Sequence, residues 1–526
     1  MNDIEIVLAL LLAVVLLAML ARRLRIPYPI LLVLGGLALA LIPGVPNVEL
    51  RPDLVFLLFL PPLLYSSAWT TSWRDFHFNL RPIGLLAIGL VLVTTTLVAL
   101  AARAAIPGLP WAAAFTLGAI VSPTDAVAAT AIAQRLGVPR RLVTVVEGES
   151  LVNDATGLVA YRFAVAAVVT GAFSLPAALV QFVLVSAGGV LIGLATGWLA
   201  TWLNRRIEDT SVAIALSFLM PFAAYLPAEA LGASGVLAAV TAGLYAGRRS
   251  VASLSPSTRI QAFAVWEMLV FLLNGLIFIL IGLQLRAVVG LLTGFSAVAL
   301  LWYGALVSAV VIAARIIWTF AAIYLPRLAS ASLRARDPSP PWHAVAVLSW
   351  MGMRGVVSLA AGLSLPLTVA SGRPFPGRDL IVFLTFAVLL ATLVAQGLSL
   401  PALIRVLGVG EDDSSAREEQ VARLAAARAG LGRLDEIAAE GWAPRVAVKR
   451  LRDRYEHMTH RFDGDGNIEE AERDTRAAGV SRRLRREVIG AERAAVIRLR
   501  DEGTINDEVL RRIERELDLQ DVWLEA

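Results

Sequence analysis

Long apolar runs separated by short polar segments occupy the first three quarters of the chain. An α-helix needs about 20 apolar residues to cross the hydrocarbon core of a bilayer. Runs of about this length cover residues 4–21, 27–42, 53–69, 81–102, 111–134, 142–169, 175–203, 210–229, 231–247, 261–285, 292–325, 342–369 and 379–405. The pattern predicts an all-α polytopic membrane protein with about thirteen transmembrane helices.

Basic residues cluster in every second loop between these runs. The clusters are Arg22-Arg23-Arg25, Arg74 with Arg81, Arg135-Arg140-Arg141, Arg205-Arg206, Arg248-Arg249 and Arg327-Arg334-Arg336. Cytoplasmic loops of membrane proteins carry an excess of Lys and Arg. We therefore expect the N-terminus outside and the C-terminus in the cytoplasm, which agrees with an odd number of spans.

Composition supports a membrane protein and excludes several other classes. Of the 526 residues, 57% are hydrophobic and 17% charged, a balance that would aggregate in a soluble protein of this length. Cysteine is absent, which excludes disulfides and thiolate metal sites. The net charge of +5 combines a basic membrane part with an acidic tail. Because the basic excess lies in short loops, no nucleic-acid partner is needed to explain it.

The composition changes abruptly after the last apolar run. Residues 408–526 hold 22 basic and 27 acidic residues, and the segment opens with Glu411-Asp412-Asp413. Residues 422–439 and 482–499 have helical periodicity, with opposite charges four positions apart. We predict a cytoplasmic helical tail, whose partner and role the pattern does not indicate.

Two of the predicted spans are interrupted by residues that break helices. The run 111–134 contains Ser122-Pro123-Thr124-Asp125, and the run 342–369 contains Trp350-Met351-Gly352-Met353-Arg354-Gly355. Backbone can leave the helical form at membrane depth only where it is buried in protein or lines a cavity. Breaks in spans five and twelve indicate two inverted repeats, as in many secondary transporters, which bind substrate where such helices meet.

Carboxylates inside span six supply the candidate chemistry. Residues 147–154 read Glu-Gly-Glu-Ser-Leu-Val-Asn-Asp, and charged side chains at this depth usually face a polar pathway or a paired charge. Ser150 and Asp154 share one helix face, and Glu149 and Asn153 lie on the adjacent one. With Asp125 and Thr124 from the first break, they could offer oxygen ligands to a small cation. Asp154 would then hold either a proton or a metal ion, although an Asp neutralised by a structural Arg is an alternative.

These residues resemble a known family. Thr124-Asp125, Glu149-Ser150 with Asn153-Asp154, Met353-Arg354-Gly355 and Leu60-Pro61-Pro62 stand in the order and at the depths found in the monovalent cation/proton antiporters. The chain is most similar to the NhaP-like bacterial sodium/proton exchangers over about three quarters of its length.

The resemblance implies a homodimer that works by an elevator motion. The transmembrane domain would cover 1–407, with a dimerisation part at about 1–80 and 210–290 and a core part at about 81–170 and 291–407. It also implies that Asp154 binds the transported sodium ion, with Asp125, the Thr124 carbonyl and Ser150 assisting. Asn153 stands where electrogenic relatives carry a second Asp, which implies one cation exchanged for one proton.

The resemblance further assigns structural roles and shows one departure. It implies that Glu149 is paired with Arg354, while Arg315 in span eleven is a second candidate partner. Many relatives carry an acid near the double proline, where this chain has Ser66, a hydroxyl that could assist the ion. Glu267 beside Trp266 is interpreted as an anchor at the membrane interface.

The resulting hypothesis is an electroneutral sodium (or lithium)/proton antiporter that serves pH homeostasis in a bacterial plasma (inner) membrane. Potassium/proton antiport is the nearest alternative, and a cation channel or a transporter-like sensor belongs to other classes. The chain contains no nucleotide-binding glycine loop, nucleophile elbow or zinc spacing, so neither an enzyme nor a cofactor is expected. The expected partners are the lipid bilayer, the transported ions and a second copy of the chain.

Overall fold

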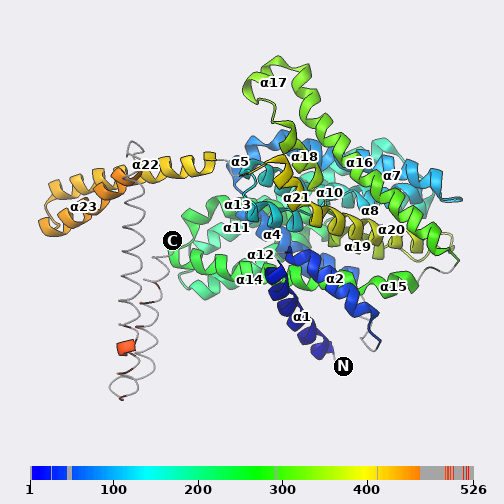
Figure 1. Ribbon diagram of the computed structural model, residues 1–526, viewed down its shortest axis with the longest axis horizontal. Coiled ribbons are helices and arrows are strands. Elements are labelled where there is room, and N and C mark those ends of the chain that lie inside the picture. Colours follow the sequence, from blue (N-terminus) through cyan, green and yellow to red (C-terminus); the bar gives the residue numbers. More distant parts are fainter. Residues whose placement is uncertain are drawn as a thin grey trace. The chain divides into compact units, whose positions relative to one another are not determined.

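The computed structural model describes residues 3–24, 26–43, 50–290, 292, 294–410 and 413–462, with a few single positions beyond 491. Within these residues the protein is helical, and the only β-type contact is an isolated bridge between Thr368 and Pro374. Figure 1 shows the arrangement of the helices in the membrane unit.

The first half of the chain forms helices α1 (Asp3–Leu24), α2 (Tyr28–Leu41), α3 (Pro52–Leu54), η1 (Val55–Phe59), α4 (Leu60–Thr70), α5 (Trp73–Phe78), α6 (Leu80–Gly84), η2 (Leu85–Leu90), α7 (Val91–Ala105), α8 (Trp111–Val121), α9 (Ala126–Arg135), α10 (Arg140–Thr170), α11 (Leu175–Asn204), α12 (Thr210–Ala230) and α13 (Gly235–Ser253). The second half forms α14 (Pro256–Leu283), α15 (Leu285–Gly290), α16 (Ala297–Ala329), α17 (Ala331–Arg336), α18 (Trp342–Trp350), α19 (Val356–Leu363), α20 (Arg378–Ala391), η3 (Thr392–Gln396), α21 (Gly397–Leu407), α22 (Asp413–Glu440) and α23 (Arg445–Phe462). The η segments are π-helical turns that continue the neighbouring α-helices without a break.

Ten helical stretches in the described part of the chain are long and apolar enough to cross a membrane, and α2 is a shorter apolar helix. The prediction of an all-helical membrane protein is therefore confirmed. Helices occupy all of the predicted apolar runs. The count of thirteen crossings and the inverted repeats stay predictions.

The chain divides into two compact units, residues 1–412 and 413–526. In the second unit α22 and α23 pack side by side, with an ion pair between Arg452 and Asp435 and the ring of Tyr455 against Gly430. The predicted helix at 422–439 lies within α22. The one predicted at 482–499 lies almost entirely outside the described residues.

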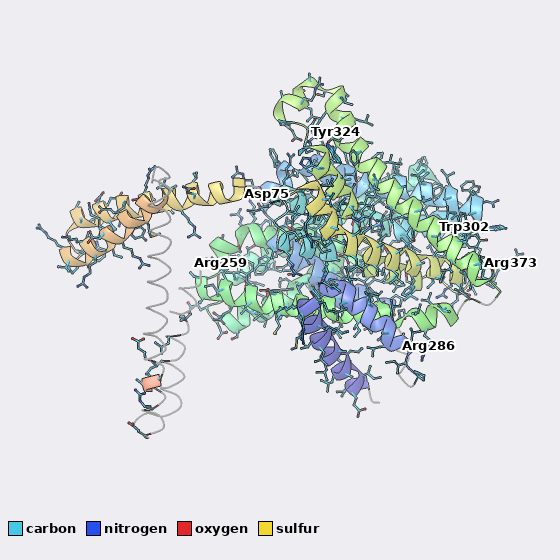
Figure 2. The ribbon with its side chains drawn as sticks, viewed as in Figure 1. Asp75, Arg259, Arg286, Trp302, Tyr324 and Arg373 are labelled. Carbon is cyan, nitrogen blue, oxygen red and sulfur yellow. The ribbon has the colours of Figure 1, made fainter. Side chains whose placement is uncertain are left out.

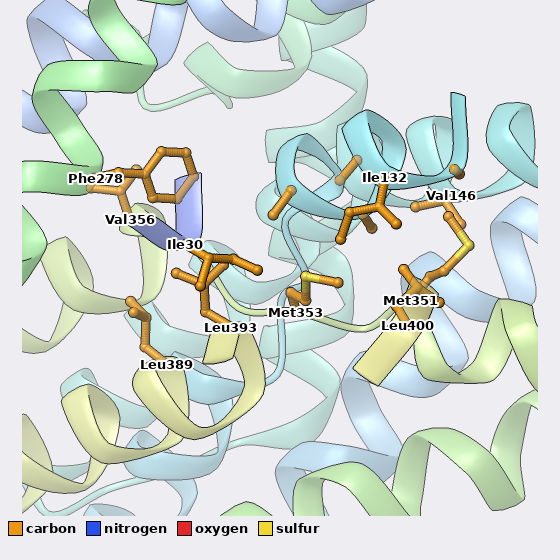
Figure 3. Close-up of a cluster of buried hydrophobic side chains, with 14 of the residues drawn as sticks. Ile30, Ile132, Val146, Phe278, Met351, Met353, Val356, Leu389, Leu393 and Leu400 are labelled. Carbon is orange, nitrogen blue, oxygen red and sulfur yellow. The ribbon is translucent and has the colours of Figure 1, made fainter. Parts of the chain in front are cut away.

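An apolar cluster surrounds the second helix break of the membrane unit. Figure 3 shows Met351 and Met353 packed among Ile132, Leu393 and Leu400, all of them buried. Inside a membrane such helices are held by close van der Waals packing, because lipid tails are as apolar as the side chains. The cluster therefore packs around the non-helical backbone of residues 351–355.

The membrane unit has two polar ends. Asp75 and Tyr324 lie at one end and Arg286 and Arg373 at the other (Figure 2). Near the first end the Tyr324 hydroxyl donates to the carbonyl of Pro340, at 2.9 Å. This contact holds the loop before α18 against α16.

Three arginines surround Asp337 in that same loop. Arg327 of α16 lies 2.6 Å from its carboxylate, Arg141 of α10 lies 2.8 Å away, and Arg81 of α6 lies 3.6 Å away. Burial alone would raise the pKa of Asp337, but the hydrogen bond from Arg141 and the three positive charges together hold that pKa below its ordinary value. The ionised carboxylate ties three membrane helices together at one end.

Candidate ion-binding site

Two broken helices meet in the interior of the membrane unit. Non-helical residues 122–125 join α8 to α9, and residues 351–355 join α18 to α19. The Asp125 amide donates to the carbonyl of Met353, at 2.8 Å. A Cβ added to Gly355 would lie 2.1 Å from Asp125 Oδ2, so only glycine permits this approach. The structure thus confirms both breaks and brings them into contact.

Each broken end has a specific partner. The Asp125 carboxylate accepts a hydrogen bond from the Val127 amide at 2.8 Å and caps α9, where a negative charge stabilises the N-terminal end of a helix. Arg354 Nε donates to the Val121 carbonyl at the end of α8, at 3.0 Å. Arg315 Nε donates to the Ser349 carbonyl at the end of α18, at 3.1 Å. Two buried cations therefore satisfy the carbonyl ends of the two interrupted helices.

Glu149 of α10 is neutralised by Arg315. Its carboxylate accepts hydrogen bonds from Arg315 at 2.5 and 3.0 Å, and both side chains are fully buried. Pairing with Arg354, which the resemblance favoured, is wrong for this structure, because Arg354 points at the carbonyls of Val121 and Gly352. Arg315 therefore neutralises Glu149, and Arg354 satisfies the backbone carbonyl at the first break.

Thr124 links the first break to α10. Its hydroxyl donates to Glu149 at 2.8 Å and accepts from Asn153 Nδ2 at 2.7 Å. The Ser150 hydroxyl accepts from the Ala126 amide at 3.3 Å. Asn153 Oδ1 is buried without a hydrogen-bond partner among the described residues. These contacts place the predicted oxygen ligands of α10 against the unwound backbone.

Asp154 differs from its neighbour Glu149 in having no partner. Its side chain is 7% exposed, and it forms no hydrogen bond or ion pair with any residue that the structure describes. It lies close enough to Asp125 for the two carboxylates to repel each other. A Cβ on Gly157 would lie 2.3 Å from Pro123 Cγ, which shows how closely α10 approaches the break beside Asp154. A proton or a cation is the natural way to neutralise such a carboxylate.

A cavity of about 950 Å³ opens beside this cluster. It is lined by α1, α2, α4, α9, α14 and α21. Val127, whose amide is capped by Asp125, lies in its wall, and so does Ser66. Ser66 is buried, and its hydroxyl forms no hydrogen bond with Thr124 or Asn153. The structure therefore places Ser66 in the cavity wall, where its assistance to the ion stays a prediction.

Two polar residues of this cavity were not predicted from the sequence. Tyr28 and Asn274 line it, and the available signal was a single polar residue within an apolar run. Glu267 also lines it, and its interpretation as an interfacial anchor stays a prediction. Trp266 beside it is buried and donates to the Ser217 hydroxyl, at 2.9 Å. Anchoring tryptophans would face the lipid headgroups instead.

Broken helices that meet at unpaired carboxylates, beside a polar cavity in a polytopic membrane unit, define the class of secondary ion transporters. The sequence profile of the transmembrane sodium/hydrogen exchangers matches residues 8–406. The chain belongs to the sodium/hydrogen exchanger family.

Similar proteins cover between 72% and 99% of this chain. An uncharacterised Na⁺/H⁺ exchanger of Mycobacterium tuberculosis is 39% identical over 99% of this chain and 96% of its own length. A sodium, potassium, lithium and rubidium/H⁺ antiporter of Bacillus subtilis is 36% identical over 72% of this chain and 58% of its own length. The structure of the sodium proton antiporter MjNhaP1 from Methanocaldococcus jannaschii matches with a TM-score of 0.61 and 19% identity, over 78% of this chain and 99% of that one. These relatives are transporters, and the last supports the fold.

Proposed function

We propose that the protein exchanges one sodium or lithium ion for one proton, with both competing for Asp154. The observation that carries this proposal is the contrast between two acids of α10. The negative charge of Glu149 is neutralised by Arg315, whereas the Asp154 carboxylate is buried without a partner in the described part of the chain. Asp125, the Thr124 carbonyl, Ser150 and Asn153 would complete the ion's oxygen shell.

The charge balance supports a one-for-one exchange. Asp125, Glu149 and Asp154 carry three negative charges when ionised, and Arg315 and Arg354 carry two positive ones. The remaining single negative charge can be neutralised by one proton or by one monovalent cation. A proton gradient of one pH unit would then supply about 1.4 kcal/mol to the coupled ion.

Alternating access would follow from an elevator motion of the core part against the dimerisation part in a homodimer. In this scheme the cavity beside Asp125 is the cytoplasmic entrance, because it is rimmed by Arg22, Arg135 and Arg405 and basic residues mark the cytoplasmic side. The N-terminus would then lie outside a bacterial plasma membrane.

Potassium/proton exchange is the second candidate. It is favoured by the Bacillus subtilis relative, whose name includes potassium and rubidium. The cavity geometry that would exclude a larger cation depends on details of the loaded site. Sodium, lithium and potassium therefore need to be compared in one assay.

The test uses purified protein in vesicles that carry a preset pH gradient. Wild-type protein is expected to dissipate the gradient on addition of sodium or lithium, whereas a channel would pass current and a sensor would do neither. Asp154→Asn is expected to abolish exchange while the protein still inserts. Asp379→Asn, the same change at a half-exposed position, should retain wild-type exchange. Normal exchange by Asp154→Asn would refute the assignment.

A further inference from the structure

The cavity beside the ion site contains one acid that the exchange scheme above does not use. Glu267 lies on α14, on the face that also presents Val270, Phe271 and Asn274 to the cavity. The spacing i, i+3, i+4 and i+7 makes one stripe of a helix. Glu267 itself is exposed to the cavity and forms no hydrogen bond or ion pair with any described residue.

The cavity shows that this exposure is to water. Glu267 lines it together with Arg22, Arg135 and Arg405. A carboxylate inside a spanning helix is costly unless it faces an aqueous space. Glu267 is therefore a hydrated negative charge in the wall of the cavity.

A second polar group faces the same space from α4. Ser66 is 8% exposed, lines the cavity, and its hydroxyl has no partner among the described residues. Helices α4 and α14 touch at this level, because the ring of Tyr65 lies 5.7 Å from that of Trp266. The neighbours of Ser66 and Glu267 along the chain are thus in direct contact. Ser66 and Glu267 therefore offer a hydroxyl and a carboxylate on adjoining walls of the same cavity.

The charges around the cavity give Glu267 its importance. Arg22, Arg135 and Arg405 line the cavity and repel cations. Glu267 is the only acid among the described lining residues. A cleft with charged walls focuses the field and changes the local concentration of ions. Without Glu267, all the charged lining residues that an entering cation passes before the buried carboxylates would be positive.

We propose that Glu267, assisted by Ser66, forms a waiting site that holds a partly hydrated monovalent cation in the cavity before it moves to Asp154. This inference rests on the proposed exchange function. The hydrogen bond from Trp266 to Ser217 fixes Glu267 to α12, so the waiting site belongs to the predicted dimerisation part. Asp125 and Asp154 belong to the predicted core part. The cation would therefore pass from the dimerisation part, which stays fixed, to the core part, which moves.

The test measures the initial rate of exchange against sodium concentration, separately on the two sides of the membrane. Everted membrane vesicles expose the cytoplasmic face, and right-side-out vesicles expose the other. Glu267→Gln is expected to raise the KM for sodium about fivefold on the cytoplasmic side only, with an unchanged maximal rate. Adding choline chloride should shrink this difference, because salt screens a hydrated charge. Glu267→Asp should restore part of the affinity.

A matched control removes the same charge elsewhere on that side. Glu208 is exposed in the loop before α12 and does not line the cavity, so Glu208→Gln should keep the wild-type KM. A wild-type KM for Glu267→Gln on both sides would overturn the waiting site and leave the role of Asp154 intact. Loss of the maximal rate would also overturn it, because Glu267 would then take part in the transport step. Failure of the proposed function is seen separately, as normal exchange by Asp154→Asn.

Discussion

Replacing Glu149 with Gln should destabilise the protein much more than it changes its affinity for cations. The Glu149 carboxylate accepts three hydrogen bonds, two from Arg315 and one from Thr124. Gln keeps one acceptor oxygen and turns an amide donor toward a donor of Arg315 or Thr124. Arg315 is fully buried and would lose the only carboxylate that it contacts in the described structure.

The size of the effect follows from the burial of that cation. Removing one member of a buried ion pair costs about 3–5 kcal/mol. Arg315 keeps its hydrogen bond to the Ser349 carbonyl, so we expect the lower end, about 3 kcal/mol. A loss of this size should lower the apparent melting temperature by about 3–4 °C. The KM for sodium should change less than threefold, because Asp154 retains its environment.

The assay is a thermal unfolding curve of detergent-purified protein together with the vesicle assay. Glu229→Gln is the matched control, since Glu229 forms a partly exposed ion pair with Arg162 at 2.6 Å and exposed pairs contribute at most about 1 kcal/mol. The double variant Glu149→Gln/Arg315→Gln should lose less stability than the sum of the single variants. Unchanged melting combined with a large change in KM would refute this reasoning.

Two further predictions concern Gly355, which lies against Asp125 in the ion site, and Asp337, which joins three helices at one end of the membrane unit. Gly355→Ala should abolish or strongly reduce exchange, because the new Cβ would lie 2.1 Å from Asp125 Oδ2. Gly362→Ala in α19, the helix that follows the break, should exchange normally in the same vesicles, because the nearest atom is 3.5 Å away. Asp337→Asn should lower stability by about 2 kcal/mol at neutral pH, measured by thermal unfolding. The native pKa of Asp337 is lowered, so its contribution is complete above the unfolded pKa of about 3.9 and is lost as pH falls through the native value. The two proteins should therefore converge in stability only below about pH 4, and convergence at neutral pH would contradict this role.

The breaks could be predicted because their cause is local. Pro123 cannot donate a helical hydrogen bond, and Gly352 and Gly355 destabilise a helix because glycine loses more backbone freedom than other residues. The structure has non-helical backbone at both places. The relative directions of Glu149, Asn153 and Asp154 could be predicted for the same reason, since helix periodicity fixes which residues share a face.

The partner of Glu149 could not be predicted from the same information. Arg315 and Arg354 are both arginines within apolar runs, and they lie 166 and 205 positions from Glu149 along the chain. Which of them reaches the carboxylate depends on how α16 packs beside α10 and α18. Once Arg354 is committed to the Val121 carbonyl, only Arg315 remains to pair with Glu149.

By itself the sequence determined the properties that depend on near neighbours: membrane-length helices, two interruptions, and three carboxylates within one span. Only the tertiary structure decided which buried carboxylates are neutralised by an arginine and which have no ion-pair partner. It placed Glu149 against Arg315, left Asp154 without a partner among the described residues, and turned Glu267 toward a cavity. The physical reason is that the cost of a buried charge depends on groups distant along the chain, and only packing brings those groups within a few ångströms of one another.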